Sequence, residues 1–305
     1  MTGSFAKREA LLDEVSQDFL TRLVHLGGYC TALQAEGIGV RESGKRVRAR
    51  LRMLQRLGFL RRVTKYPIVY QVTKSATRLH GPDSSSRRRH SLTTVEARLL
   101  GVHFYLEAHS WPAHFVFDHE EKIMTFENAG CPLSVLPQRN GKPYVREHFV
   151  LWFPSGRITV AAVELPQPGI VRRLRLFIRQ YLPLLRHLRH DLDLLVVTAD
   201  KRRTYTYQRL LRTNRTIQKL VLGSLVENIK PYSVRPPVPS ITELTWPKAD
   251  DWIVKDQEQP TFVRRRKIKR HEQQAQWRAQ SPPLRDQESK RDSHRADSFP
   301  LTHSP

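Results

Sequence analysis

The sequence of 305 residues has few cysteines, few acidic residues relative to basic ones, and no long apolar run. Two cysteines, Cys30 and Cys131, are too few for a disulfide framework, which favours a reducing intracellular setting. The apolar runs are short and carry charges, and residues 1–15 contain no uninterrupted apolar stretch. We therefore predict neither a transmembrane helix nor a signal peptide, and expect a cytoplasmic protein with no membrane partner.

The common catalytic signatures are missing as well. The sequence contains no Gly-rich phosphate loop and no Gly-x-Ser-x-Gly elbow. Its 13 histidines form no His-Glu-x-x-His motif, and the two cysteines form no Cys-x-x-Cys motif. These patterns hold zinc in many proteins. The sequence thus predicts no metal site and no cofactor.

What the chain has in excess is positive charge. It carries 52 lysines and arginines against 29 acidic residues, a formal net charge of +23. Such a balance favours a polyanionic partner, first nucleic acid and second an anionic membrane surface. The densest window, 41–62, holds nine basic residues and one acid, Glu42.

The region 8–80 has the pattern of a winged helix-turn-helix domain. Apolar spacing predicts helices over 8–26, 31–37 and 43–57, the last two capped by Thr31 and Ser43. Strands at 59–64 and 68–73 then form a hairpin around a turn at 65–67. In this layout the helix before the hairpin enters the major groove and the hairpin tracks the DNA backbone.

The basic residues of this region fall where that layout needs them. The apolar stripe of the third predicted helix is Val47, Leu51, Leu54 and Leu57. The predicted DNA contacts on the same helix are Lys45, Arg46, Arg48, Arg50, Arg52 and Arg56. Those of the hairpin are Arg61, Arg62 and Lys65. The alternative is that the arginines only solvate a small helical domain that contacts proteins.

A basic linker at 81–92, with Arg87, Arg88 and Arg89 as further DNA contacts, precedes an α/β domain predicted over 93–230. A capping box at Thr93 opens its first helix. Strands are predicted at 114–118, 122–127, 148–153, 158–165 and 193–199, and 158–165 is expected to be central and buried. Helices are predicted at 170–190, kinked or broken at Pro183, and from about Thr204. Together these segments indicate one central sheet.

Glu164, at the end of the predicted central strand, is the one weak catalytic candidate. Restriction-endonuclease-like nucleases place an acid there, followed two residues later by a lysine, and two acids hold Mg²⁺. Here Pro166 replaces the lysine, and no upstream acid at the matching strand is obvious, although Asp118 and Glu127 are candidates. A plain strand-end carboxylate is the alternative. Enzymatic activity is therefore left open, with a non-enzyme favoured and Mg²⁺ required only by the nuclease alternative.

The C-terminal part changes in composition. A proline-rich arm is predicted over 231–262, followed at 263–305 by a basic, largely disordered tail. Arg264, Arg265 and Arg266 in this tail are predicted to clamp DNA phosphates without sequence preference. A solvated tail with no dedicated role is the alternative.

Several short strings, in this order of elements, resemble the replication-relaxation family of plasmids and other mobile elements. They are Arg-Arg-His90-Ser-Leu, Val-Glu164, Arg179-Gln180-Tyr181 and Leu-Leu-Val-Val-Thr-Ala-Asp-Lys-Arg-Arg. The resemblance covers about residues 15–210, and the sequence departs from it at Pro166 and Pro183. It implies a winged helix joined to a degenerate restriction-endonuclease-like domain, in a bacterial cytoplasm and associated with the nucleoid or a plasmid.

Three functions are consistent with these observations. The first is a double-stranded DNA-binding protein acting in replication, relaxation, transfer or transcriptional control of a mobile element. The second is a Mg²⁺-dependent DNA nuclease using Glu164. The third is a scaffold for replication or relaxase proteins. Residues 8–26 or 93–108 are candidates for a homodimer contact, which the spacing does not decide.

Overall fold

The computed structural model describes residues 4–40, 44–64, 67–79, 90–145, 148–164, 168–221 and 223–234. Within these ranges the chain is a mixed α+β protein with a three-stranded sheet, a five-stranded sheet and a two-stranded ribbon. All the described residues belong to one compact unit. No helix among them is long and apolar enough to cross a membrane.

The first helical segment is divided in two. α1 (Phe5–Glu9) and α2 (Glu14–His25) are separate helices, so the prediction of one helix over 8–26 is wrong. The Asp13 side chain accepts a hydrogen bond from the Ser16 backbone N–H at 3.0 Å. This N-cap interaction begins a new helix and interrupts an otherwise continuous apolar periodicity.

The next two helices follow the predicted pattern. α3 (Ala32–Ile38) starts at Thr31, which forms the predicted capping box with Gln34. α4 (Gly44–Arg56) buries the predicted stripe of Val47, Leu51, Leu54 and, just after the helix, Leu57. Gly58 follows with φ +78, a left-handed conformation that favours glycine at a helix end. Ser43, the predicted cap of α4, lies outside the described residues.

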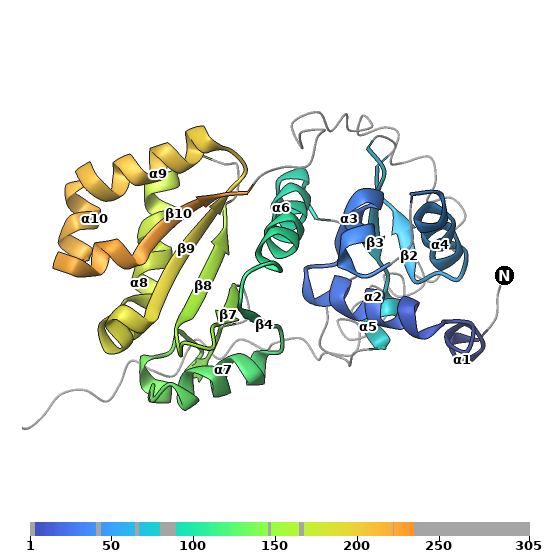
Figure 1. The fold of residues 1–305 in the computed structure, drawn as a ribbon, viewed down its shortest axis with the longest axis horizontal. Helices are drawn as coiled ribbons and strands as arrows, with labels where there is room; N and C mark the ends of the chain where they lie inside the picture. The colour runs from blue at the N-terminus through green and yellow to red at the C-terminus, as the bar shows by residue number, and fades with distance from the viewer. Residues whose placement is uncertain are drawn as a thin grey trace, which may run out of the picture. The chain divides into compact units, whose positions relative to one another are not determined.

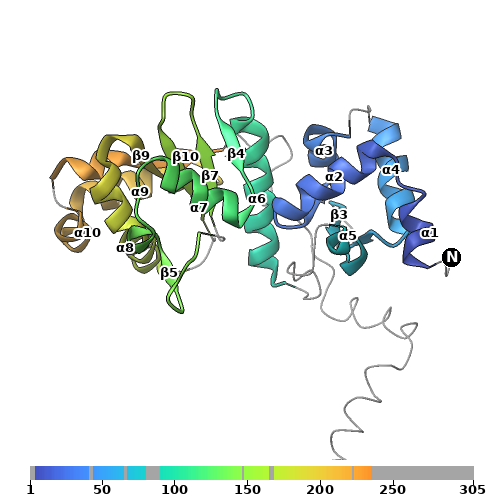
Figure 2. The same cartoon turned by 90° about the horizontal axis from the view of Figure 1, so that it is seen from below.

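The predicted hairpin is confirmed and gains a third strand. β2 (Leu60–Arg62) runs antiparallel to β3 (Val69–Val72), with Arg61 opposite Gln71. β1 (Tyr29–Thr31), which the sequence analysis missed, pairs with the other edge of β3. α5 (Lys74–Arg78) follows the hairpin. Figure 2 shows α2, α3, α4 and α5 gathered around β3.

α6 (Leu92–Ala108) is buried on both sides. Its N-cap is Ser91, whose side chain accepts from the Thr94 N–H, so the predicted cap at Thr93 is wrong by two residues. Val102 and Tyr105 pack into the core of the N-terminal elements. Phe104 packs against the five-stranded sheet from the same helix. A helix that is apolar nearly all round is expected to be buried in this way.

The larger sheet has the strand order β10-β9-β8-β7-β4, with β8 in the centre as predicted. Its strands are β4 (His114–Val116), β7 (Phe149–Trp152), β8 (Ile158–Val163), β9 (Leu192–Thr198) and β10 (Ile229–Ser233). β8, β9 and β10 are mutually parallel, whereas β7 runs antiparallel to β4 and to β8.

Helices cover both faces of this sheet. α8 (Ile170–Leu188), α9 (Lys201–Thr213) and α10 (Arg215–Leu220) lie on one face and α6 on the other (Figure 1). Neighbouring residues of β9 alternate between the two layers, because successive side chains of a strand point to opposite faces. Leu194 and Val196 join the core beneath α8, while Leu195 and Val197 join the core beneath α6.

The predicted strand at 122–127 is wrong, because α7 (His119–Asn128) occupies this segment. The Asp118 carboxylate accepts hydrogen bonds from the backbone N–H groups of Glu120 and Glu121 and so begins a helix. Lys122 and Phe126, four residues apart, form its buried side. A short ribbon of β5 (Gln138–Arg139) and β6 (Lys142–Pro143) follows, which the sequence analysis did not predict.

Two further boundaries differ from the sequence prediction. α8 continues through Pro183 as one helix, so of the predicted kink or break the break does not occur. The start of the proline-rich arm at 231 is also wrong, because Pro231 lies inside β10. β10 is an edge strand, where a residue without a backbone N–H is tolerated.

Candidate nucleic-acid interface

α4 separates its apolar and basic side chains onto two faces. While its leucines are buried, Lys45, Arg46, Arg48, Arg52 and Arg56 are all exposed. The sequence contains no acidic residue between Glu42 and Asp83. The exposed face of α4 thus carries positive charge without an acidic side chain of the same helix to neutralise it.

The hairpin adds charge next to this face. Arg62 of β2 is exposed, and its Nε donates to the Thr64 carbonyl at 2.8 Å. The charges of Arg62, Arg52 and Arg48 all act on Tyr70 of β3. Burial raises the pKa of the Tyr70 hydroxyl, and these three arginines oppose that rise. The positive charges of α4 and of the hairpin therefore meet around Tyr70. The sequence analysis did not single out this residue.

Two arginines predicted as DNA contacts are engaged within the fold. Arg50 donates to both carboxylate oxygens of Asp13, at 2.7 and 2.6 Å, and to the Ser16 hydroxyl at 2.9 Å. Its side chain is only 14% exposed. Arg61 is half-buried and donates from Nε to the Gln71 side chain at 2.9 Å. Arg50 ties α4 to the start of α2, while Arg61 ties β2 to β3.

The structure therefore groups the predicted contacts into an exposed set that we call the α4 basic face. It consists of Lys45, Arg46, Arg48, Arg52, Arg56 and Arg62. Lys65, the linker residues Arg87, Arg88 and Arg89, and the tail residues Arg264, Arg265 and Arg266 lie outside the described residues.

Glu164 is a buried carboxylate that forms an ion pair with α9. It follows β8, its side chain is 4% exposed, and Oε1 lies 3.6 Å from Arg203 Nη1 of α9. Burial raises the pKa of Glu164, while Arg203 and a hydrogen bond with Tyr207 act to lower it. Among the described residues no three His, Cys, Asp or Glu side chains are grouped to hold a metal. Asp118 caps α7, and Glu127 is exposed on that helix.

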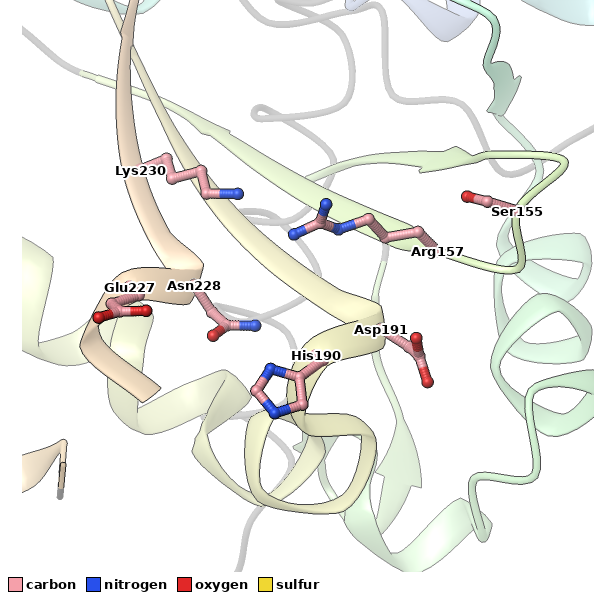
Figure 3. Close-up of a pocket in the computed structure, with 7 residues that line it drawn as sticks. All are labelled: Ser155, Arg157, His190, Asp191, Glu227, Asn228 and Lys230. Carbon is pink, nitrogen blue, oxygen red and sulfur yellow. The ribbon is translucent and has the colours of Figure 1, made fainter. Parts of the chain in front are cut away.

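A polar pocket of about 460 Å³ lies at the other end of the parallel strands. Figure 3 shows Arg157 and Lys230 pointing toward each other across β9. Both hold the buried Asp193 carboxylate, each with a shortest contact of 2.9 Å. Asn228 donates to the carbonyls of Arg189 and Leu192. The polar groups around this pocket thus fasten β8, β9 and β10 together, which is a structural role.

No known protein family, curated protein or solved structure matches this chain. The resemblance to the replication-relaxation family stays a prediction.

Proposed function

We propose that the protein binds double-stranded DNA through the α4 basic face. The observation that carries the proposal is the exposed cationic side of α4, continued by Arg62 of the hairpin around Tyr70. The order α2, β1, α3, α4, β2 and β3 supports reading this region as a winged helix-turn-helix domain. In such domains the helix before the hairpin lies in the major groove, which is wide enough for one α-helix.

The resemblance found in the sequence supplies a biological setting for this activity. We propose that the duplex belongs to a plasmid or other mobile element, and that the protein acts in its replication, relaxation, transfer or transcriptional control. The fold of the larger sheet as a degenerate restriction-endonuclease-like domain is part of the same proposal. The central position of β8 and the place of Glu164 at its end support it.

The α4 basic face is tested by removing three of its charges. A Lys45→Gln, Arg48→Gln, Arg52→Gln variant should bind a duplex at least ten-fold more weakly, because each phosphate contact contributes through counterion release. The slope of log affinity against log salt should become shallower by about 2.7, that is about 0.9 for each lost contact. Fluorescence anisotropy with a labelled duplex at several salt concentrations measures both quantities.

A matched control carries the same loss of charge on another helix. Arg172→Gln, Arg179→Gln, Arg186→Gln removes three exposed arginines from α8. This control should keep duplex affinity within about three-fold of wild type at 0.15 M salt, where charges beyond about 8 Å are largely screened. Equal losses in the two triple variants would contradict the proposal, because binding would then follow net charge alone.

Arg50 and Arg52 offer a second pair of variants with opposite expected effects. Arg50→Gln breaks the ion pair with Asp13, so the free energy of unfolding should fall by about 1 kcal/mol while duplex affinity stays near wild type. Arg52→Gln should weaken duplex binding several-fold and leave stability unchanged. Urea unfolding and anisotropy titration of both variants check this. A loss of affinity in Arg50→Gln without loss of stability would place Arg50 on the DNA instead.

A further inference from the structure

The outer face of α9 combines an exposed aromatic ring with positive charge. Tyr205 is 66% exposed, the highest value among the exposed large hydrophobic residues of the described chain. Arg202 lies three residues before it, and Arg209 and Arg212 lie four and seven residues after it. Residues at these intervals share one side of an α-helix. Tyr205 therefore stands within a stripe of arginines.

The buried side of α9 shows that this stripe faces away from the core. Tyr207 and Leu211 are the buried residues of α9, and both belong to the core beneath the sheet. They lie on the side of the helix opposite Tyr205, given 100° of rotation per residue. Arg202, Arg209 and Arg212 are all exposed. The ring of Tyr205 and the three guanidinium groups are thus presented together.

The charge of the stripe is not balanced locally. No acidic residue occurs between Lys201 and Val221. Asp200 caps the helix by accepting from the Arg203 N–H, and the Arg203 side chain is the one that contacts Glu164. Within the described part of the chain, no carboxylate forms an ion pair with Arg202, Arg209 or Arg212.

An exposed aromatic ring flanked by cations is suited to one class of ligand. Aromatic side chains stack on nucleobases whose faces are free, and arginines hold the phosphates on either side. Bases in a duplex are already stacked on one another, so their faces are not accessible. Arg202 and Arg212 are about 15 Å apart along the helix axis at 1.5 Å per residue, so the stripe can contact several phosphates of one strand.

We propose that the outer face of α9 binds single-stranded nucleic acid, with Tyr205 stacking on an unpaired base and Arg202, Arg209 and Arg212 contacting the backbone. This goes beyond the duplex binding proposed for α4, because the ligand and the helix both differ. DNA and RNA strands share the chemistry that the stripe recognises.

The test uses the full-length protein and a fluorescein-labelled oligonucleotide of twenty thymidines, followed by anisotropy. Tyr205→Ala should weaken binding about ten-fold, whereas Tyr205→Phe should stay within two-fold because it keeps the stacking ring. Leu176→Ala is the matched control, since Leu176 is 54% exposed on α8 and lacks a ring. It should bind as wild type does. Wild-type affinity in Tyr205→Ala, or equal losses in Tyr205→Ala and Tyr205→Phe, would overturn the proposal.

A strand without bases separates stacking from charge. The wild-type protein should bind an abasic strand of the same length with the low affinity that Tyr205→Ala has for the thymidine strand. The Tyr205→Ala variant should have the same affinity for the abasic strand as for the thymidine strand. Arg209→Gln should make the salt slope shallower by about 0.7 on either strand. Tighter binding of a uridine strand would support the proposal with RNA as the ligand, and tighter binding of thymidine would support it with DNA.

A failure of the α9 proposal can be distinguished from a failure of the duplex proposal. The triple variant of the α4 basic face should keep its affinity for the thymidine strand. Tyr205→Ala should keep its affinity for a blunt duplex. If α4 proves not to bind duplex DNA, the ratio of the single-strand affinities of Tyr205→Ala and Tyr205→Phe still tests the role of α9.

Discussion

Replacing Phe104 by alanine should lower the free energy of unfolding by about 3–5 kcal/mol, the range for a large buried aromatic residue. Phe104 lies on α6 and is fully buried. Its ring contacts the rings of Trp111, Phe115, Phe149 and Tyr232, with centroids 5.8 to 6.1 Å apart. Removing it would leave a cavity between α6 and the sheet that these neighbours fill only in part.

The same variant tests whether the sheet and the N-terminal elements unfold together. Two of the five tryptophans, Trp111 and Trp152, lie at the five-stranded sheet, so part of the fluorescence signal reports on the sheet, and circular dichroism reports on all helices. Because α6 belongs to the cores on both of its sides, the two signals should follow one transition in wild type and in Phe104→Ala. Phe104→Leu, which keeps most of the volume, should cost about 1 kcal/mol. A Phe104→Ala variant as stable as wild type would show that α6 does not carry this packing.

Acidification from pH 6.5 to 5 should destabilise the protein mainly through the buried His103 and the half-buried His148. Burial lowers the pKa of His103 to about 4 and that of His148 to about 4. The unfolded chain therefore binds protons from pH 6.5 downward while the folded chain does not, and stability is lost as the pH falls. Each histidine should contribute a loss of about 1.5 kcal/mol over this interval, because half of an unperturbed imidazole is already protonated at pH 6.5. The raised pKa of Glu164 acts in the opposite direction and offsets part of it.

Urea unfolding at several pH values measures this loss. His148→Gln should remove about half of the pH dependence, because it removes one of the two histidines. Glutamine is chosen because it can still form a hydrogen bond with the Tyr181 hydroxyl, which lies 2.9 Å from His148 Nδ1. A variant with both histidines replaced by glutamine should lose most of this pH dependence, because the lowered pKa of His25 and the raised pKa of Glu164 then act in opposite directions. A wild-type unfolding midpoint that stays constant from pH 6.5 to 5 would contradict the assignment of these two histidines.

The parts of the fold that the sequence predicted are those with strong local signals. The capping box of Thr31 and Gln34 begins α3 as expected, and the apolar stripe from Val47 to Leu57 is buried as expected. The strands predicted at 158–165 and 193–199 are β8 (Ile158–Val163) and β9 (Leu192–Thr198). In each case a few neighbouring residues determine the element.

The parts that were missed depend on partners distant in the sequence or on competing local signals. β1 has only three residues and exists because it pairs with β3, some forty residues further along the chain. In α7 the cap at Asp118 outweighs an apolar run that favours a strand.

The candidate site shows the same limit. The sequence identified the arginines of α4 but not which of them faces solvent. Arg50 has the same local surroundings as Arg48 and Arg52, and only the fold brings it against Asp13, 37 residues away. A count of charges along a helix therefore overstates the number available to a ligand.

α6 has a practical consequence for dividing the protein into fragments. The helix begins at Leu92, yet Gln34 donates to the Leu99 carbonyl at 2.9 Å and Arg98 donates to the Gly27 carbonyl at 2.6 Å. An N-terminal fragment that stops before residue 92 would expose Tyr29 and Val69, which α6 covers. Such a fragment should aggregate when expressed alone and become soluble when residues 90–234 are supplied as a second polypeptide. A fragment ending after Ala108 should expose Phe104 instead. Neither end of α6 is therefore a suitable boundary for a stable fragment.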